Sequence, residues 1–319
     1  MTSPPGPPII NALTFDVEYW FDGFDLPAAA RRALPSRLAV GLWRVLNLLD
    51  AYKVKATFFI LGGLVDEWRS LLGHIAEAGH EIAVHGFRHR PIYRLTPAEF
   101  AVDLQQALQA VRTFTGRPVQ SYRAPFFSIT RRSLWALPLL ARAGLRRDSS
   151  IVPAANPRYG IPQARREPHW VSLIDPAGRS SEPGLAEYPI STLTWGRLRL
   201  PFSGGFYARL LPYRLIHQAT RQLNAQGQPV IFYFHPWELD PAQPRLDGQA
   251  PALYRFTHYY RLNSTAATLE ALLRNFPFAR LADLPVPATS AAYQPNPRSI
   301  QSQPDGLTGQ PVRERGQEK

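Results

Sequence analysis

The sequence predicts an α/β fold of parallel βαβ units, either doubly layered or closed into a barrel. Two observations carry this prediction. Short apolar runs typical of buried strands alternate with amphipathic helical patterns along most of the chain. In addition, the residues best suited to chemistry stand at strand ends, where βα barrels carry their active sites.

Each expected strand is an apolar run bounded by glycine, proline or polar residues. The strands are expected at Ile9–Asp16, Ala56–Leu61, Glu81–Val84, Gln120–Arg123, Arg146–Ser149 and Pro229–His235. Ala56–Leu61 is apolar or uncharged throughout and is followed by two glycines, which predicts a short strand buried on both faces.

The expected helices show apolar residues at helical spacing. One helix begins after Ser36, one is opened by Thr96 as N-cap and Pro97 as first residue, and the others span Leu64–Ala78, Thr130–Ala143 and Ser264–Asn275. The stretch 152–228 is rich in proline and glycine, and we expect it to be irregular.

One globular domain is expected at residues 9–284. Residues 1–8 are half proline, and residues 285–319 are rich in Pro, Gln, Ser and Gly, so we expect a flexible lead and a disordered tail. The sequence shows no basic segment followed by an apolar one at its start, and no run of eighteen apolar residues. A cytoplasmic location, without a membrane span, is the resulting expectation.

Charge and cysteine content narrow the function classes. The 36 basic and 24 acidic residues give a net charge of +12, but the basic residues are scattered rather than gathered on one helix or stripe. This pattern argues against a nucleic-acid partner and suits an anionic glycan or a membrane surface. The absence of cysteine excludes disulfides, thiolate metal ligands and cysteine nucleophiles.

A divalent metal site is predicted from four residues. His85 and His89 stand four residues apart, a spacing at which two imidazoles can converge on one ion. Asp16 and Glu18 are two residues apart after a strand and can face the same side. Either acid could be the third ligand, with the other free to act as a base. The same histidines could instead be ordinary surface or structural residues.

Three further residues at strand ends complete a hydrolytic site. Arg123 could orient a catalytic carboxylate through a bidentate contact, and His235 could protonate a leaving group. Asp148 could hold His235 in the required tautomer. This arrangement suits hydrolysis of an amide or an ester. Aromatic residues in loop-like contexts are candidates for stacking on sugar rings: Trp20, Phe21, Phe24, Trp195, Phe206, Tyr207 and Trp237.

These residues lie in segments that resemble the polysaccharide deacetylases (carbohydrate esterase family 4, the NodB homology domain). The resemblance extends to the branch with a DUF3473 region at about 150–284, which is associated with exosortase (XrtA/PEP-CTERM) exopolysaccharide loci. The segments that carry it are Leu13–Glu18, Lys55–Gly62, Gly79–His89, Tyr122–Pro125, Asp148–Ser150 and Tyr233–Pro241. The resemblance implies a distorted (β/α)7-type barrel, a divalent metal, and removal of N-acetyl groups from hexosamines of a glycan.

The resemblance also implies a role for each residue. Asp16 is similar to the family's base, Arg123 to the arginine that holds it, His235 to its catalytic histidine and Asp148 to the acid beside that histidine; His85 and His89 are similar to its metal ligands. Tyr122 and Pro125 are expected near the substrate, with Trp20, Phe206 and Trp237. The family usually has a second aspartate where this chain has Val17, so Glu18 is expected to be the third ligand. The ion is expected to be Zn²⁺, with Co²⁺ or Ni²⁺ as alternatives.

Three functions are consistent with these residues. The leading one is an N-deacetylase in exopolysaccharide synthesis, acting in the cytoplasm or peripherally on the inner membrane with the polysaccharide-synthesis machinery. A cyclic-imide or allantoinase-like amidohydrolase would share the metal site but need a small closed pocket. A non-catalytic glycan-binding barrel would need no metal.

Overall fold

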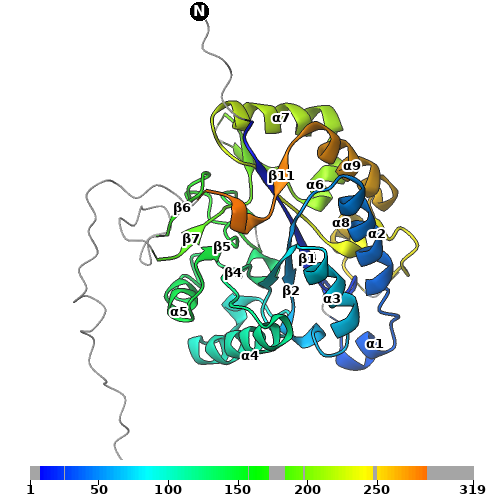
Figure 1. Cartoon of the computed structure of the whole chain (residues 1–319), viewed down its shortest axis with the longest axis vertical. Helices are drawn as coiled ribbons and strands as arrows, with labels where there is room; N and C mark the ends of the chain where they lie inside the picture. Colours follow the sequence, from blue (N-terminus) through cyan, green and yellow to red (C-terminus); the bar gives the residue numbers. More distant parts are fainter. Residues whose placement is uncertain are drawn as a thin grey trace, which may run out of the picture.

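The computed structural model describes residues 8–285, apart from residues 25, 157, 172–183, 197 and 247–249. Within these residues, a nine-stranded sheet in the order β10-β1-β2-β3-β4-β5-β7-β6, with β11 also paired to β1, curls into an open half-barrel (Figure 1). Its pairings are parallel, except that β6 runs antiparallel to β7. The distorted α/β barrel expected from the sequence is therefore confirmed. The expected lead and tail lie almost entirely outside the described residues.

The strands of this sheet are short and buried, as the apolar runs predict. They are β1 (Asn11–Val17), β2 (Thr57–Ile60), β3 (Glu81–Val84), β4 (Ser121–Tyr122), β5 (Arg147–Asp148), β6 (His169–Trp170), β7 (Ala186–Glu187), β10 (Ile231–Phe234) and β11 (Phe278–Ala279). Every residue of β1 is buried, because the strand lies inside a parallel sheet with β2 on one side and β10 on the other. Its carboxyl end therefore lies on the rim of the sheet, between the carboxyl ends of β10 and β2.

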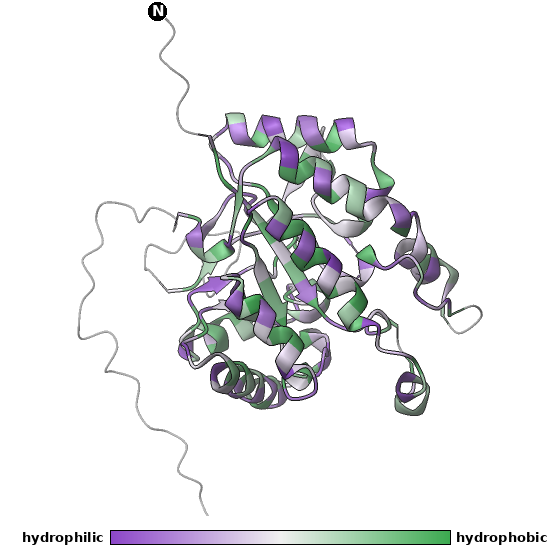
Figure 2. Ribbon diagram, turned by 45° about the vertical axis from the view of Figure 1, so that its right-hand side comes forward, coloured by the Kyte–Doolittle hydropathy of each residue, from purple (hydrophilic) through white to green (hydrophobic). Residues whose placement is uncertain are grey.

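The helices pack around this sheet with their apolar sides inward. They are α1 (Ala28–Arg32), α2 (Leu38–Ala51), α3 (Arg69–Glu77), α4 (Pro97–Thr115), α5 (Ala136–Arg142), α6 (Gly205–Leu210), α7 (Tyr213–Ala225), α8 (Ala252–Tyr259) and α9 (Thr265–Asn275). In Figure 2 the central strands are mostly green, whereas the helices around them carry both green and purple. Thr96 caps α4, as the sequence predicts, and the structure adds a reciprocal capping box with Glu99. No helix of the described chain is both long and apolar enough to cross a membrane.

The stretch 152–228 is not irregular, and that prediction is wrong. It contains β6, β7, the two-stranded hairpin of β8 (Thr192–Trp195) and β9 (Leu198–Pro201), and the helices α6 and α7. Helix α7 buries Ile216, Ala219 and Leu223, of which only two are large apolar residues. Its inward face is too narrow to stand out in a segment otherwise rich in polar side chains.

A short 3₁₀ helix, η4 (Pro236–Leu239), follows β10 and is held closely by its neighbours. Gly41 of α2 lies so near the Pro236 carbonyl that any side chain there would collide with it. Arg44 donates a hydrogen bond of 2.6 Å to the Leu239 carbonyl, and Arg37 forms a two-point ion pair with Asp240 at 2.5 and 2.8 Å. Residues on η4 are thereby fixed relative to α2.

Candidate metal centre

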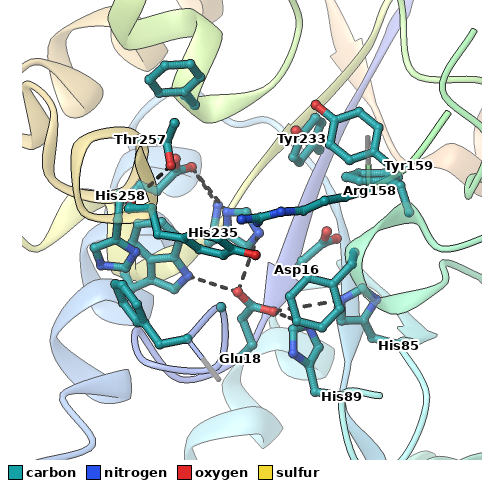
Figure 3. A pocket seen from close by; sticks show the side chains of 18 of the residues that line it. Asp16, Glu18, His85, His89, Arg158, Tyr159, Tyr233, His235, Thr257 and His258 are labelled. Atoms are coloured by element: carbon teal, nitrogen blue, oxygen red, sulfur yellow. Dashed lines mark hydrogen bonds and ion pairs between the residues drawn. The ribbon is translucent and has the colours of Figure 1, made fainter. Parts of the chain in front are cut away.

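A cavity of about 210 Å³ opens at the carboxyl ends of β1, β3 and β10 (Figure 3). Asp16 and Glu18 reach it from the end of β1, His85 and His89 from the loop after β3, and His235 from the end of β10. Residues separated by more than 200 positions in the chain thus meet at one rim of the sheet, as predicted from the strand-end positions.

Glu18, His85 and His89 form a set of donors suited to one metal ion. One ligand atom from each lies within 4.8 Å of the other two. Oε2 of Glu18 is 2.6 Å from Nε2 of His89 and 4.0 Å from Nε2 of His85. Two imidazoles and one carboxylate, with room for further ligands in a cavity, are the donor set of a catalytic zinc site. The three residues therefore fit a divalent ion of this kind.

The environment of His85 prepares it as a neutral ligand. Its Nδ1 lies 2.9 Å from the backbone carbonyl of Arg123, which can only accept a hydrogen bond, so Nδ1 carries the proton. Burial lowers the pKa of His85 to about 4, against the raising effect of Asp16. Its Nε2 lone pair is therefore free to bind a metal at neutral pH, a common arrangement for metal-binding histidines.

Glu18 stays ionised although it is buried. Burial alone would raise the pKa of its carboxyl group, but the charges of His89 and His235 hold that pKa well below its usual range. Nε1 of Trp237 also donates to Oε1 of Glu18 at 3.2 Å, and Nε2 of His235 lies 3.6 Å from the same oxygen. Both carboxylate oxygens are therefore oriented by side chains from two different loops.

The two histidines converge through a strained loop and not along a helix. His89 has a φ of 49°, in the left-handed region that non-glycine residues seldom occupy, and Gly86 has a φ of 78°. Asp103 of α4 holds the loop by accepting hydrogen bonds from the backbone N–H groups of Phe87 at 2.8 Å and Arg88 at 3.3 Å. The four-residue spacing predicted the convergence, but Asp103 could not be inferred from it.

Asp16 and Arg123 form a buried pair beside this centre. Nη1 of Arg123 donates to Oδ1 of Asp16 and to the Thr14 hydroxyl, both at 2.7 Å. The prediction that Arg123 makes a bidentate contact with the carboxylate is wrong. Its Nη2 and Nε instead donate to the hydroxyl and carbonyl oxygens of Ser149, at 2.9 and 3.0 Å. Arg123 is fully buried. The second oxygen of Asp16 is thus left free of the arginine.

The carboxylate beside His235 is Glu238, not Asp148. Oε2 of Glu238 lies 3.5 Å from Nδ1 of His235 and accepts from the His235 backbone N–H at 3.0 Å. Oε1 of Glu238 accepts from Nη2 of Arg209 at 2.9 Å. Burial opposes protonation of His235, but the charges of Glu18 and Glu238 raise its pKa to about 9. The sequence-based role of Asp148 at His235 is therefore a misassignment.

Asp148 belongs to a separate buried cluster. It lies opposite Glu187 in the pairing of β5 with β7, and the Ser150 hydroxyl donates to its Oδ1. Burial raises the pKa of Asp148 to about 6 and that of Glu187 well above its usual range. Two carboxyl groups in contact cannot both ionise cheaply, so the pair holds one proton near neutral pH.

We expect this pair to make the fold less stable as pH rises. Both pKa values are raised on folding, so the stabilisation is complete below about pH 4 and is lost as pH rises, through about 6 for Asp148 and at higher pH for Glu187. Urea unfolding at pH 4 and pH 8 should show a loss on the order of 2 kcal/mol from this source. Glu187→Gln should remove most of this pH-dependent loss of stability, because its amide can donate to Asp148 and needs no titrating proton to do so. An unchanged pH dependence in that variant would contradict the assignment.

The aromatic candidates divide between the cavity and the core. Phe206, Phe24 and Trp237 line the cavity. Trp237 stacks between His235 and His258, with ring centroids 4.9 and 4.1 Å away. Trp20, Phe21, Tyr122 and Pro125 are buried and do not line the cavity as the structure describes it, so the expectation that Trp20, Tyr122 and Pro125 contact substrate is not supported. The side chain of Trp195 lies outside the described residues.

Several cavity residues could not be selected from the sequence. Glu238 is an acid three residues after His235, and this spacing with Pro236 as N1 is a capping-box signal that could have found it. Arg158, Tyr159, Arg209 and His258 come from segments without a recognisable motif. His258 is kept neutral because burial lowers its pKa to about 3, and its Nε2 lies 2.7 Å from Oε1 of Gln243.

Comparison with known proteins assigns two family models to the chain. Residues 5–146 match the polysaccharide deacetylase family, and residues 149–285 match a domain of unknown function, DUF3473. The first model includes Asp16, Glu18, His85, His89 and Arg123, and the second includes His235 and Glu238. The cavity is therefore built from both matched regions.

Curated relatives match over the first part of the chain. A peptidoglycan deacetylase of Helicobacter pylori is 28% identical over 135 residues, which cover 41% of this chain and 44% of that protein. A chitooligosaccharide deacetylase of Bradyrhizobium is 31% identical over 105 residues, covering 32% of this chain and 45% of that protein. The chain thus spans less than half the length of these relatives.

Solved structures match over most of the chain. A protein described as a polysaccharide deacetylase from Mycobacterium smegmatis has a TM-score of 0.56 and 20% identity, with 88% of each chain covered. An allantoinase has a TM-score of 0.58 and 14% identity, covering 88% of this chain and 90% of its own. At these identities the likeness establishes the fold.

Proposed function

Because the chain carries a polysaccharide deacetylase domain over residues 5–146, we propose that it is a metal-dependent hydrolase of N-acetylated glycans. It removes acetyl groups from hexosamine residues. One observation carries the proposal: the three metal donors share a cavity with Asp16, held by Arg123, and with His235, next to Glu238. A base and an acid on opposite sides of a Lewis-acid site are what amide hydrolysis needs.

Residues 9–284 act as one unit on a bacterial exopolysaccharide or its precursor, in the cytoplasm or at the inner membrane beside the synthesis machinery. The match to DUF3473 supports an exopolysaccharide substrate because the branch that the chain resembles is associated with exopolysaccharide loci. The DUF3473 region also supplies His235 and most of the aromatic residues that line the cavity, so it forms part of the site.

Glu18, His85 and His89 would hold the ion, which we propose to be Zn²⁺. When bound, such an ion polarises the acetyl carbonyl and lowers the pKa of water. The borderline donor set also suits Co²⁺ or Ni²⁺. His89 packs against Phe126, with the rings tilted and their centroids 4.4 Å apart, which limits where its imidazole can move.

The chain's own residues would move the protons. The free oxygen of Asp16 takes the proton of the attacking water, while Arg123 keeps that carboxylate in place. His235, whose imidazolium form is stabilised by the neighbouring Glu238 carboxylate, donates a proton to the amine that leaves. Glu238 holds the imidazolium at Nδ1 so that Nε2 is the donating nitrogen. Products are acetate and a free amino sugar.

We expect His85→Ala to lose both stoichiometric metal and turnover. Purified protein would be analysed for bound metals and then incubated with N-acetylglucosamine oligomers and native polymer, with acetate release as the readout. The matched control is His74→Ala, which removes a half-buried histidine on α3 outside the cavity. No acetate from any substrate with any divalent metal would count against the proposal, and metal-free wild-type protein would favour a glycan-binding barrel.

An allantoinase-like activity remains the second candidate because the cavity is small. Its volume of about 210 Å³ is below the ~300–1,000 Å³ common for ligand pockets. It can hold a terminal sugar with its acetamide, or a small cyclic amide. Allantoin and cyclic imides should therefore be assayed with the same preparation. Turnover of these compounds without acetate release from glycans would favour the second candidate.

A further inference from the structure

Arg158 reaches into the cavity without an acidic partner. Its half-buried side chain lines the cavity, extending from the side of Tyr159 toward that of His235 (Figure 3). Among the described residues no carboxylate forms an ion pair with it. Burial lowers its pKa, and only the neighbouring tyrosines Tyr93 and Tyr159 oppose that effect. A guanidinium in such a place costs solvation free energy that no carboxylate of the described chain offsets.

The other charges of the cavity are already matched. Asp16 contacts Arg123 at 2.7 Å and Glu238 contacts Arg209 at 2.9 Å. Glu18 is surrounded by the three imidazoles of the centre. Arg158 is therefore a surplus cation beside a set of paired charges. The overall +12 charge of the chain adds to the same field.

Tyr254 fixes the orientation of this guanidinium. Cζ of Arg158 lies 3.2 Å from the centroid of the Tyr254 ring, so the guanidinium rests on the face of a ring carried by α8. A stacked guanidinium keeps its N–H groups pointing outward in its own plane. That fork matches the two oxygens of a carboxylate or the oxygens of a phosphate.

We propose that Arg158 and Tyr254 form a subsite for an oxyanion on the glycan. The substrate would then be an acidic glycan, in which a carboxylate or phosphate group lies close to the N-acetylated hexosamine. This inference rests on the proposed function and narrows its substrate class. Arg158, which would bind the anion, is held by Tyr254 of α8. The anion subsite and the catalytic centre therefore lie on separate elements around the same cavity.

Three substrates distinguish the possible anions. They are a neutral N-acetylglucosamine tetramer, a tetrasaccharide of alternating glucuronic acid and N-acetylglucosamine, and uridine diphosphate N-acetylglucosamine. We expect Arg158→Gln to lower kcat/KM for the carboxylate or the phosphate substrate about 10-fold or more beyond any loss on the neutral tetramer. Arg158→Lys should restore only part of it, because the ammonium lacks the planar fork. Selective loss on one substrate identifies the anion.

A binding assay separates this inference from the proposed function. Calorimetric titration of the acidic tetrasaccharide and of the nucleotide sugar into the protein needs no turnover, so it can be read even if no acetate is released. Arg158→Gln should weaken binding of one of them, while Arg142→Gln, which removes an exposed arginine at the end of α5, should not. Equal losses on neutral and anionic ligands, or no loss on any ligand, would overturn the subsite.

Discussion

Asp16→Asn should keep the bound metal but lower kcat by about 10²–10⁴-fold, the range typical of a removed general base. The amide has nearly the same shape, and its oxygen can still accept from Nη1 of Arg123, which now lies 2.7 Å from Oδ1. What disappears is a group able to take a proton from water. Asp16 is not one of the three donors that lie within 4.8 Å of one another, so metal binding should survive.

Glu18→Gln is the matched control for this experiment. It makes the same chemical change two residues away, on the carboxylate that contacts His89 at 2.6 Å. We expect it to lose metal and turnover together. Metal content and acetate release would be measured for both variants under one set of conditions. Retained turnover in Asp16→Asn, or loss of its metal, would show that the two acids have other roles.

The placement of the centre could be predicted from the sequence because it depends on short-range rules. Residues two apart on a strand face the same side, which brings both Asp16 and Glu18 to the cavity. The ends of parallel strands share one rim, which brings His85 and His235 to it as well. These rules need no knowledge of the strand order.

The partners of these residues could not be predicted, because they depend on the strand order and on the way the sheet curls. Asp148 ends β5 and His235 follows β10, but these strands lie five places apart along the sheet, and Asp148 meets its register partner Glu187 instead. Arg123 reaches Asp16 from β4, across the curl of the sheet. Arg158 and Arg209 come from a stretch whose structure the sequence did not reveal.

Glu238→Gln should lower kcat about 10- to 100-fold, by analogy with the cost of removing the carboxylate partner of a metal-binding histidine, with little change in KM or metal content. The carboxylate that faces Nδ1 of His235 would become an amide, whose nitrogen could repel the imidazole N–H. Arg209 would lose its buried counter-charge, so the variant should also be less stable by ~3–5 kcal/mol. Assays at low temperature keep the variant folded while kcat is measured.

Two further variants separate orientation of His235 from a general loss of stability. Gly205→Ala leaves every charge in place but puts a methyl group against the Glu238 carboxylate, so it should lower kcat by moving that carboxylate. Asp148→Asn changes an equally buried acid that faces Glu187, and it should leave kcat nearly unaltered. If Asp148→Asn lowered kcat as much as Glu238→Gln at equal folded fraction, the carboxylate that governs His235 would have to be reassigned. Comparing Glu238→Gln with Asp148→Asn therefore tests whether the carboxylate after β10 or the one at the end of β5 is the partner of His235.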